Sequence, residues 1–434
     1  MINAGEYILC WLRNSFRAVM NPSLNFSIDA ANMLGQPAFV LITPGAGFAS
    51  LLLRQYSFMM EGIAELSTSL AEKGIAAVIR MGDAAEELAA FGARASVVVT
   101  DSGYLRHERE MEKKAFTLLS CPFVTVESST VVPLRALPGR EEYSAATLRP
   151  RISRILHLYL NPAPDPLPRI DSTGMSIKGA PESMDMFHGN TIIDEAVPVV
   201  EGKRGGYSSA RSLLDEFINT KLMYYGERRN DPSLDATSGL SPYLHSGQIS
   251  PVEVTLSAMG RAGEDAHVFI DELVIRRELA FNFVRYNENY DSIRSIPRWA
   301  METLAANEQI EREYIYTLDQ FEKASTHDPY WNAAQKQLVT TGVIHNYMRM
   351  YWGKKIIQWT PSPEKAYEYM VYLNNRYALD GNDPNSYGGI AWCFGKHDRP
   401  WASRPVFGKV RYMNDRGLLR KFDMKPYLEK YPAP

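Results

Sequence analysis

Short apolar runs alternate with amphipathic helical patterns over the first 130 residues, and this alternation constrains the fold more than any other feature of the chain. The apolar runs predict five strands: Tyr7–Leu12, Phe39–Thr43, Ala76–Met81, Ser96–Thr100 and Phe123–Val126. The segments between them predict four helices: Leu24–Leu34, Gln55–Lys73, Ala84–Phe91 and His107–Leu118. Strands that alternate with helices form βαβ units, so we predict an α/β domain built on a doubly wound parallel sheet.

A different pattern follows this region. Residues 161–207 are rich in proline, glycine and charge, which is typical of a connecting segment. After them strand patterns nearly vanish, and long helical repeats dominate, for example Ser209–Tyr224, His267–Tyr286 and Ala333–Trp359. The sequence therefore predicts an α/β domain over residues 1–160, a linker over 161–207 and a mostly α-helical domain over 208–434.

The chain lacks the motifs of several common enzyme classes. It has neither a GxGxxG fingerprint nor a Walker loop, so a nicotinamide or ATP site is not supported. Its three cysteines form no CxxC pair and its eight histidines occur singly, which argues against a metal site and suits a reducing compartment. There is no secretory signal pattern and no unbroken apolar span. We expect a soluble intracellular protein, cytoplasmic or nuclear.

Positive charge gathers near the C-terminus, although the whole chain carries a formal net charge of −3. Residues 391–430 hold ten Lys or Arg against four acidic residues. A face that binds phosphates needs such a local excess, because neutralised phosphates release their counterions. A merely solvated basic surface is the alternative interpretation.

Two tryptophans, Trp352 and Trp359, lie seven residues apart in HNYMRMYWGKKIIQW, and a third, Trp331, lies upstream in THDPYWNAAQ. Seven residues are close to two helical turns, so the two indoles would share one face of a helix, roughly 10 Å apart along its axis. Because tryptophan is readily oxidised, indoles at this spacing can carry an electron from the protein surface to a buried acceptor. A buried aromatic stripe is the alternative.

Several long blocks resemble the class II cyclobutane pyrimidine dimer photolyases of the photolyase/cryptochrome family, which are light-driven DNA repair flavoproteins. In chain order the blocks are ERRNDPSLDATSGLSPYLHSGQIS, HNYMRMYWGKKIIQW, LNNRYALDGNDPNSYGGIAW, HDRPW and FGKVRYM. The resemblance implies a monomeric deoxyribodipyrimidine photo-lyase, a carbon–carbon lyase that uses reduced FAD to repair cyclobutane pyrimidine dimers in double-stranded DNA. It also implies an antenna chromophore in the N-terminal domain, where 8-hydroxy-deazaflavin and methenyltetrahydrofolate stay open as alternatives.

The resemblance assigns one set of residues to FAD. The segment SGLSPYLHSGQIS would hold the diphosphate, although hydroxyl residues before a helix also serve plain N-capping. Arg349 and Asp380 would form a buried bidentate pair beside flavin N5, which Asn374 would face. Asp383 and Asn385 belong to the same loop, which is also a plain turn. The complete predicted set is Tyr224 (with Tyr225 as the alternative), Ser238, Gly239, Leu240, Ser241, Gln248, Arg349, Asn374, Asp380, Asp383 and Asn385.

A second set is assigned to the lesion and the duplex. Glu272, otherwise an ordinary surface or paired carboxylate, would hydrogen-bond the dimer from a dry pocket that raises its pKa. Trp392 would pack against the dimer once it has left the duplex, and Tyr347 and Met350 would line the same pocket. Arg411 would enter the vacated space in the duplex. The complete predicted set is Glu272, Tyr347, Met350, Trp392, Arg399 and Arg411.

The predicted catalytic residues are Glu272, Asn374 and the three tryptophans. The indoles of Trp352, Trp331 and Trp359, in that order outward, would photoreduce oxidised flavin. Two positions depart from the family: Ser246 replaces a usual phenylalanine, and Arg276 replaces the tryptophan of some members, so Arg276 receives no stacking role. The alternative function is a cryptochrome-like blue-light photoreceptor without repair activity.

Overall fold

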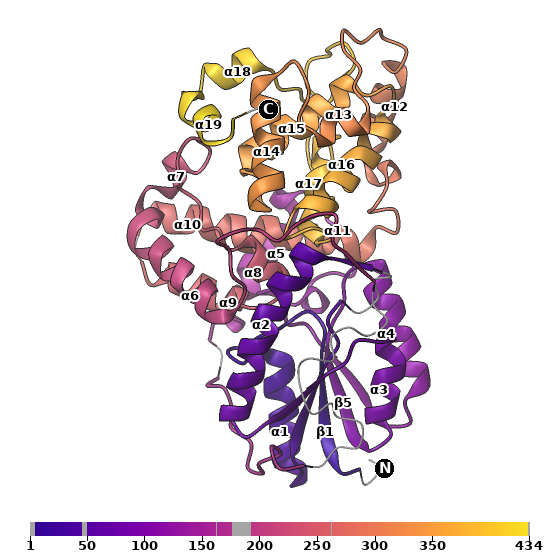
Figure 1. Cartoon of the computed structure of the whole chain (residues 1–434), viewed down its shortest axis with the longest axis vertical. Coiled ribbons are helices and arrows are strands. Elements are labelled where there is room, and N and C mark those ends of the chain that lie inside the picture. Colours follow the sequence, from indigo (N-terminus) through magenta and orange to yellow (C-terminus); the bar gives the residue numbers. More distant parts are fainter. Residues whose placement is uncertain (1–4, 46–49, 162, 176–191, 262, 433–434) are drawn as a thin grey trace. The chain divides into compact units, whose positions relative to one another are not determined.

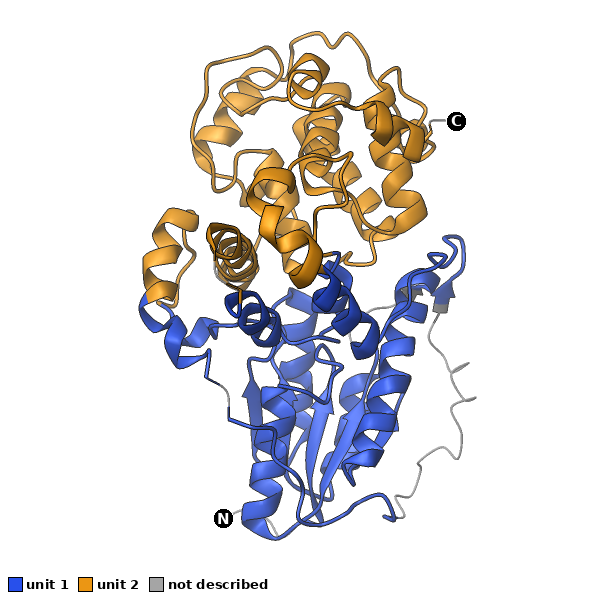
Figure 2. Ribbon diagram, turned by 90° about the vertical axis from the view of Figure 1, so that its left-hand side faces the viewer, with its two compact units in different colours: residues 1–137, 154–216, 239–260 blue, residues 138–153, 217–238, 261–434 orange. Residues whose placement is uncertain are grey.

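The computed structural model of the protein describes the whole chain except residues 1–4, 46–49, 162, 176–191, 262 and 433–434 (Figure 1). Contacts divide the chain into two compact units, each assembled from three stretches of sequence (Figure 2). Unit 1 comprises residues 1–137, 154–216 and 239–260, and unit 2 comprises residues 138–153, 217–238 and 261–434. The predicted domain boundaries at residues 160 and 207 follow chain order and stay a prediction. Residues 162 and 176–191 of the predicted linker lie outside the described residues.

Unit 1 is built on a five-stranded parallel sheet. Its strands are β1 (Tyr7–Leu12), β2 (Ala38–Ile42), β4 (Ala76–Ile79), β5 (Ala95–Asp101) and β6 (Phe123–Val126), and their order across the sheet is β4-β2-β1-β5-β6. Every neighbouring pair is parallel; Cys10 in the central β1, for example, pairs with Val40 and Val99. All five predicted strands are therefore confirmed.

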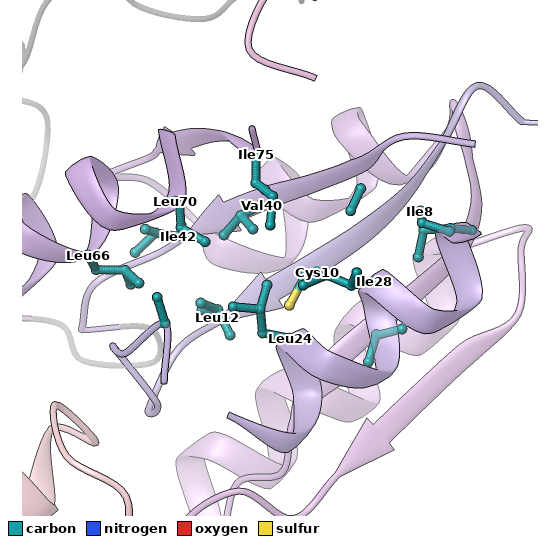
Figure 3. Close-up of a cluster of buried hydrophobic side chains, with 14 of the residues drawn as sticks. Ile8, Cys10, Leu12, Leu24, Ile28, Val40, Ile42, Leu66, Leu70 and Ile75 are labelled. Atoms are coloured by element: carbon teal, nitrogen blue, oxygen red, sulfur yellow. The ribbon is translucent and has the colours of Figure 1, made fainter. Parts of the chain in front are cut away.

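Helices cover both faces of this sheet, as continuous apolar strands require. The even-numbered side chains of β1 join a core cluster with residues of α1 and α2 (Figure 3). The odd-numbered side chains join a second cluster with residues of α3 and α4. Successive side chains of a strand point to opposite faces, so one unbroken apolar run serves both layers. The bounds of these helices are α1 (Pro22–Leu34), α2 (Leu53–Glu72), α3 (Ala84–Gly92) and α4 (Arg106–Leu118).

Unit 1 also contains two short strands that the sequence pattern did not predict. Strands β3 (Ser50–Leu52) and β7 (Ile192–Asp194) form a separate two-stranded parallel sheet. Three residues are too few to show the alternation by which a strand is read. The remaining α-helices that lie wholly in unit 1 are α6 (Tyr207–Glu216), α8 (Ser241–His245) and α9 (Pro251–Met259).

The described part of unit 2 is helical and contains no strand, which confirms the predicted helical character of the C-terminal region. Helix α5 (Ala145–Ile155) begins in this unit. The helices that lie wholly within it are α7 (Tyr225–Arg228), α10 (Glu264–Ile270), α11 (Arg277–Tyr286), α12 (Arg298–Ala306), α13 (Leu318–Glu322), α14 (Pro329–Thr341), α15 (Asn346–Trp359), α16 (Pro363–Tyr377), α17 (Pro384–Cys393), α18 (Asp415–Leu419) and α19 (Lys425–Lys430). Two π-helical segments join them, Phe217–Lys221 and Asp271–Arg276.

The single helix predicted over Ala333–Trp359 is wrong, because the chain breaks it into α14 and α15. Gly342 adopts a left-handed conformation with φ of 68°, and it ends α14 as a C-cap. His345 then starts α15, since its Nδ1 accepts a hydrogen bond from the backbone N–H of Tyr347 at 3.2 Å. The break sets Trp331 on α14, apart from the two tryptophans of α15.

Two negative findings apply to the described residues alone. None of their helices combines the length and apolar character needed to cross a membrane. No three of their His, Cys, Asp or Glu side chains gather in a way that could hold a metal ion.

Candidate functional site

The three predicted tryptophans are buried and form one connected set in unit 2. Trp352 and Trp359 lie on one helix, α15, as the spacing predicts, and Trp331 lies on α14. The indole Nε1–H of Trp331 donates to the backbone oxygen of Trp352 at 3.0 Å. The ring of Trp331 also lies 6.2 Å from that of Trp359, edge to face. Trp331 thus contacts both other residues and occupies the middle of the set.

The outermost predicted indole, Trp359, does not reach the surface, because it is only 2 % exposed. The rings of Tyr316 and His327 lie against it at 5.6 and 4.9 Å. Tyr314 stacks on His327 at 3.8 Å and is 38 % exposed. These aromatic residues, which the sequence analysis missed, continue the buried set towards solvent. Their only sequence signal is the alternating pair of tyrosines in EYIYTL.

Arg349, Asn374 and Asp380 come together between α15, α16 and the loop after α16. Arg349 Nη1 donates to Asn374 Oδ1 at 2.9 Å, whereas its Nη2 lies 3.9 Å from Asp380 Oδ1. The expected bidentate pair is therefore wrong, because the amide oxygen takes the short contact with the guanidinium. Asp380 Oδ1 is buried and accepts no hydrogen bond among the described residues. The group combines a cation, a buried amide and an unsatisfied carboxylate oxygen.

The loop that follows is held by its own side chains. Asp383 caps α17 and accepts hydrogen bonds from the backbone N–H and the side-chain amide of Asn385, at 2.7 and 2.9 Å. Asn382, with φ of 57°, is tied to Asn375, whose amide donates to Asn382 Oδ1 at 2.8 Å. The turn predicted for DGNDPN is confirmed, and it fixes Asp383 and Asn385 relative to α17.

The segment predicted to hold a diphosphate is divided between the two compact units of the chain. Ser238 closes a stretch of unit 2, whereas Gly239, Leu240, Ser241 and Gln248 belong to unit 1. Within unit 1, Gly239 has φ of 68° and open space where a side chain would stand. The N-cap residue of α8 is Leu240, whose side chain makes no capping hydrogen bond.

Gln248 is a structural residue rather than an accessible one. It is 0 % exposed, its Oε1 accepts from the backbone N–H of Gly206 at 2.6 Å, and its Nε2 donates to the backbone oxygen of Phe58 at 3.2 Å. No surface is left for a ligand, which contradicts the predicted cofactor contact. Ser246 is likewise committed, because its Oγ donates to the backbone oxygen of Pro242 at 2.9 Å.

The choice between Tyr224 and Tyr225 is informed by their burial. Tyr225 is 8 % exposed and packs edge-on against Phe217 and Phe269, with ring centroids 5.6 and 5.3 Å away. Tyr224 is 39 % exposed, and the guanidinium of Arg228 lies 4.1 Å from its ring centroid. Tyr225 thus belongs to the core of unit 2, and Tyr224 is the tyrosine with accessible surface.

Glu272 lies in the π-helical segment Asp271–Arg276 and is paired with two arginines. Its Oε1 lies 2.9 Å from Arg229 Nη1 and 3.0 Å from Arg276 Nε. The side chain is 23 % exposed. The dry pocket expected around this carboxylate is therefore wrong, because two guanidinium groups surround the partly exposed side chain. The π-helix, a rare form often found at functional sites, also gave no sequence signal.

The remaining predicted lesion residues lie on α15 and α17. Met350 Sδ is 4.0 Å from the Sγ of Cys393, the residue that follows Trp392. Trp392 itself lies below the guanidinium of Arg276, 5.8 Å from the ring centroid, and its ring is 6.1 Å from that of His397. Tyr347 packs edge-on against Phe422 at 4.9 Å. Met350 and Trp392 thus pack against other side chains of unit 2, whereas Tyr347 contacts the C-terminal segment.

Arg399 and Arg411 flank an exposed indole in the segment that follows α17. Their guanidinium carbons lie 5.6 and 5.0 Å from the ring centroid of Trp401, which is 42 % exposed. The base of this segment is held by Lys396, whose buried Nζ donates to the backbone oxygen of Ser295 at 2.8 Å. Two cations around an exposed aromatic face form a platform that suits stacked bases and phosphates. Trp401 was missed by the sequence analysis.

Three buried titratable groups in unit 2 have strongly shifted pKa values. Burial lowers the pKa of His345 and that of His397 to about 4. It also lowers the pKa of Lys354 to about 8, and the Nζ of this lysine donates to the backbone oxygen of Cys393. Desolvation disfavours the charged form of each group. Both histidines are therefore neutral at pH 7.

The chain is similar to known proteins along nearly all of its length. The DNA photolyase family matches residues 8–169. The deoxyribodipyrimidine photo-lyase of Methanothermobacter thermautotrophicus is 43 % identical, over 98 % of this chain and 94 % of its own length. That of Potorous tridactylus is 35 % identical, over 97 % of this chain and 80 % of its own length.

Similarity to a solved structure extends to the fold. An archaeal photolyase from Sulfolobus tokodaii, solved with two FAD molecules, is 16 % identical, with a TM-score of 0.72 over 98 % of this chain and 90 % of that chain. At this identity the likeness shows the fold alone. It confirms the predicted combination of an α/β sheet domain with a helical region.

Proposed function

Because this chain belongs to the DNA photolyase family, we propose that it is a class II deoxyribodipyrimidine photo-lyase that repairs cyclobutane pyrimidine dimers in double-stranded DNA. The observation that carries the proposal is the identity of 43 % and 35 %, over nearly the whole chain, with two proteins that are named for this activity. The chain is accordingly an enzyme. These relatives favour repair over a photoreceptor function.

FAD is the proposed cofactor, and the residues around Arg349 fit a flavin. A flavin ring presents both hydrogen-bond donors and acceptors along one edge, and Arg349, Asn374 and Asp380 offer both kinds of partner. Asp380 Oδ1 is buried and accepts no hydrogen bond from the part of the chain that the structure describes, which is costly unless a ligand supplies a donor. Reduced FAD, when bound, would supply one electron to the dimer on illumination and recover it afterwards.

Arg349 would orient the amide of Asn374 towards the cofactor. The guanidinium holds Asn374 Oδ1 at 2.9 Å, and Asn374 Nδ2 donates to Asn375 Oδ1 at 3.1 Å. An amide nitrogen carries two N–H groups, so one remains for a ligand. Asn374 would therefore present a donor, and the buried oxygen of Asp380 an acceptor. This pair would fix the ring edge in one orientation.

The tryptophans would deliver electrons to oxidised cofactor. Trp352 shares α15 with Arg349, Trp331 contacts Trp352 and Trp359, and the aromatic residues beyond Trp359 lead to the exposed Tyr314. The three tryptophans are buried, and Trp331 contacts both of the others. The set therefore supports photoreduction that passes through the helical unit.

Glu272 and Trp392 would receive the lesion, and the basic segment would hold the duplex. The two arginines that pair with Glu272 fix the direction of its carboxylate. Trp392 offers an indole face for the dimer, which must leave the duplex to be reached. Trp401, between Arg399 and Arg411, would support the DNA beside the vacated position.

Light-dependent recovery of intact thymines tests this function. The purified protein with reduced FAD is mixed with a duplex that contains one thymine dimer, and recovery is measured in the dark and under blue light. We expect recovery only under light. If the FAD-loaded protein restores no intact thymines under light, the repair function fails. The photoreceptor function would then be the remaining proposal.

A further inference from the structure

Three arginines surround two carboxylates next to the proposed lesion residues. Arg149 lies on α5, Arg229 follows α7, and Arg276 ends the π-helical segment that also carries Asp271 and Glu272. All five side chains belong to unit 2. The cluster therefore carries one positive charge more than its carboxylates neutralise.

Both carboxylates have a partner other than Arg276. Arg149 binds Asp271 with two hydrogen bonds, from Nε at 2.7 Å and from Nη2 at 3.0 Å. Arg229 Nη1 lies 2.9 Å from Glu272 Oε1. A bidentate guanidinium–carboxylate pair is among the stronger polar contacts in proteins. Arg276 is thus the surplus cation of the cluster.

Arg276 forms ion pairs with both carboxylates, but its Nε donates no hydrogen bond to the described residues. Its Nε lies 3.0 Å from Glu272 Oε1 and 3.6 Å from Asp271 Oδ2, yet this buried nitrogen makes no hydrogen bond to the described residues. The wider winding of a π-helix brings residues five apart, such as Asp271 and Arg276, onto one side, and Glu272 lies four residues before Arg276. An arginine has five N–H donors in a planar fork, and the side chain of Arg276 is 37 % exposed.

Arg276 also lies against the indole proposed to pack on the dimer. Its guanidinium carbon is 5.8 Å from the ring centroid of Trp392. The opposite neighbour, His397, is neutral at pH 7 because burial lowers its pKa to about 4. The surplus charge is therefore placed within reach of a lesion that contacts both Glu272 and Trp392.

We propose that Arg276 binds the phosphodiester that joins the two nucleotides of the dimer. The inference rests on the proposed function. Pyrimidine bases are uncharged, so the phosphate is the anionic group that a dimer brings to this cluster. A guanidinium fork matches a phosphate with two parallel hydrogen bonds. Arg276 would thus recognise the linkage within the lesion, while Glu272 and Trp392 contact the bases.

A double-mutant cycle in the dark tests the contact directly. The FAD-loaded wild type and Arg276→Gln are titrated, at one salt concentration, with a dimer duplex that has either the native phosphate or a neutral methylphosphonate between the joined nucleotides. We expect the neutral linkage to weaken wild-type binding by about 10- to 100-fold, as the loss of a charge-assisted hydrogen bond requires. Arg276→Gln should show the same loss with the native phosphate, and no further loss with the neutral one.

The control variant is Arg298→Gln, which removes an arginine that is 92 % exposed and paired with Glu302 in the same unit. It should keep the full response to the neutral linkage. Arg276→Lys, which keeps the charge but not the fork, should recover part of the affinity.

The outcomes separate this inference from the function on which it rests. If the wild type binds both linkages equally, no cation of the protein contacts that phosphate. The inference then fails whether or not Arg276→Gln folds. If Arg276→Gln still loses affinity with the neutral linkage, another residue makes the contact and the inference also fails. If the wild type does not prefer dimer duplex to intact duplex, the proposed function itself fails.

Discussion

The burial and hydrogen bonding of a side chain determine whether it can bind a ligand or only stabilises the fold. Both polar atoms of the Gln248 amide bond to backbone inside unit 1, whereas Asp380 keeps a buried oxygen that accepts no hydrogen bond from the described residues. Both belong to sequence blocks that match one family, so the sequence suggested the same role for each. Their difference depends on neighbours distant in the chain, such as Phe58 and Gly206 for Gln248. Only the folded structure places those neighbours.

Stability should fall in mild acid because His345 is neutral in the folded protein. Its pKa is about 4 when folded and about 6.5 when unfolded, so the unfolded chain binds the extra proton first. Stability is then complete above about pH 6.5 and declines as the pH falls to about 4. His345→Asn removes the titration and keeps an N-cap for α15. We expect urea unfolding to show about 1–3 kcal/mol less acid loss in this variant than in the wild type.

The exposed histidine His157 gives the control for this measurement. His157→Asn should follow the wild-type pH profile. An acid loss in His345→Asn equal to that of the wild type would show that His345 does not titrate between these pH values.

At the scale of elements, the sequence predicted regular structure well and its interruptions poorly. Strands β1 and β6 match their predicted bounds, because continuous apolar runs flanked by polar turns leave little choice. The break between α14 and α15 was missed, since Gly342 and His345 stand within an otherwise continuous helical pattern. The π-helical turn at Asp271–Arg276 has no pattern at all. The break and the π-helical turn both lie beside proposed site residues.

Trp331, on the helix before the break, contacts the backbone of Trp352 and the ring of Trp359, so its removal should interrupt photoreduction. In Trp331→Phe, oxidised FAD should be reduced far more slowly under light with added thiol, as followed by its absorption. The chemically reduced variant should still repair dimers. The control is Trp299→Phe on α12, which changes a tryptophan outside the connected set. Normal photoreduction in Trp331→Phe would exclude the proposed path.

Variants of the basic segment after α17 should distinguish lesion recognition from general DNA binding. Arg411 lies against Trp401 and is proposed to fill the vacated space in the duplex, so Arg411→Ala should weaken binding of the dimer duplex more than of the intact duplex. The selective loss should be on the order of 1–3 kcal/mol. Arg420→Ala, an exposed arginine of the same charged region, should affect both duplexes alike. Equal losses with Arg411→Ala, measured at one salt concentration, would reduce Arg411 to an ordinary phosphate contact.

At the scale of the whole molecule, neither unit follows a single stretch of sequence. Residues 239–260 join unit 1 although helical unit 2 surrounds them in the chain, and residues 138–153 join unit 2. The composition along the chain shows where an α/β pattern gives way to a helical one. It does not show which later segments pack with an earlier unit. The family resemblance suggested the proposed function, and the structure added the contacts around Arg276, Trp331 and Trp401. An antenna chromophore in the α/β region stays a prediction, which the absorption spectrum of the native protein tests.

The central claim is that the electron given to the dimer returns to the cofactor, so that repair consumes no reductant. The most direct measurement counts the dimers repaired per reduced FAD under anaerobic illumination, with no reductant added. The account predicts many dimers per FAD, with the reduced absorption spectrum unchanged at the end. Repair that stops at one dimer or fewer per FAD, with the cofactor left oxidised, would contradict it.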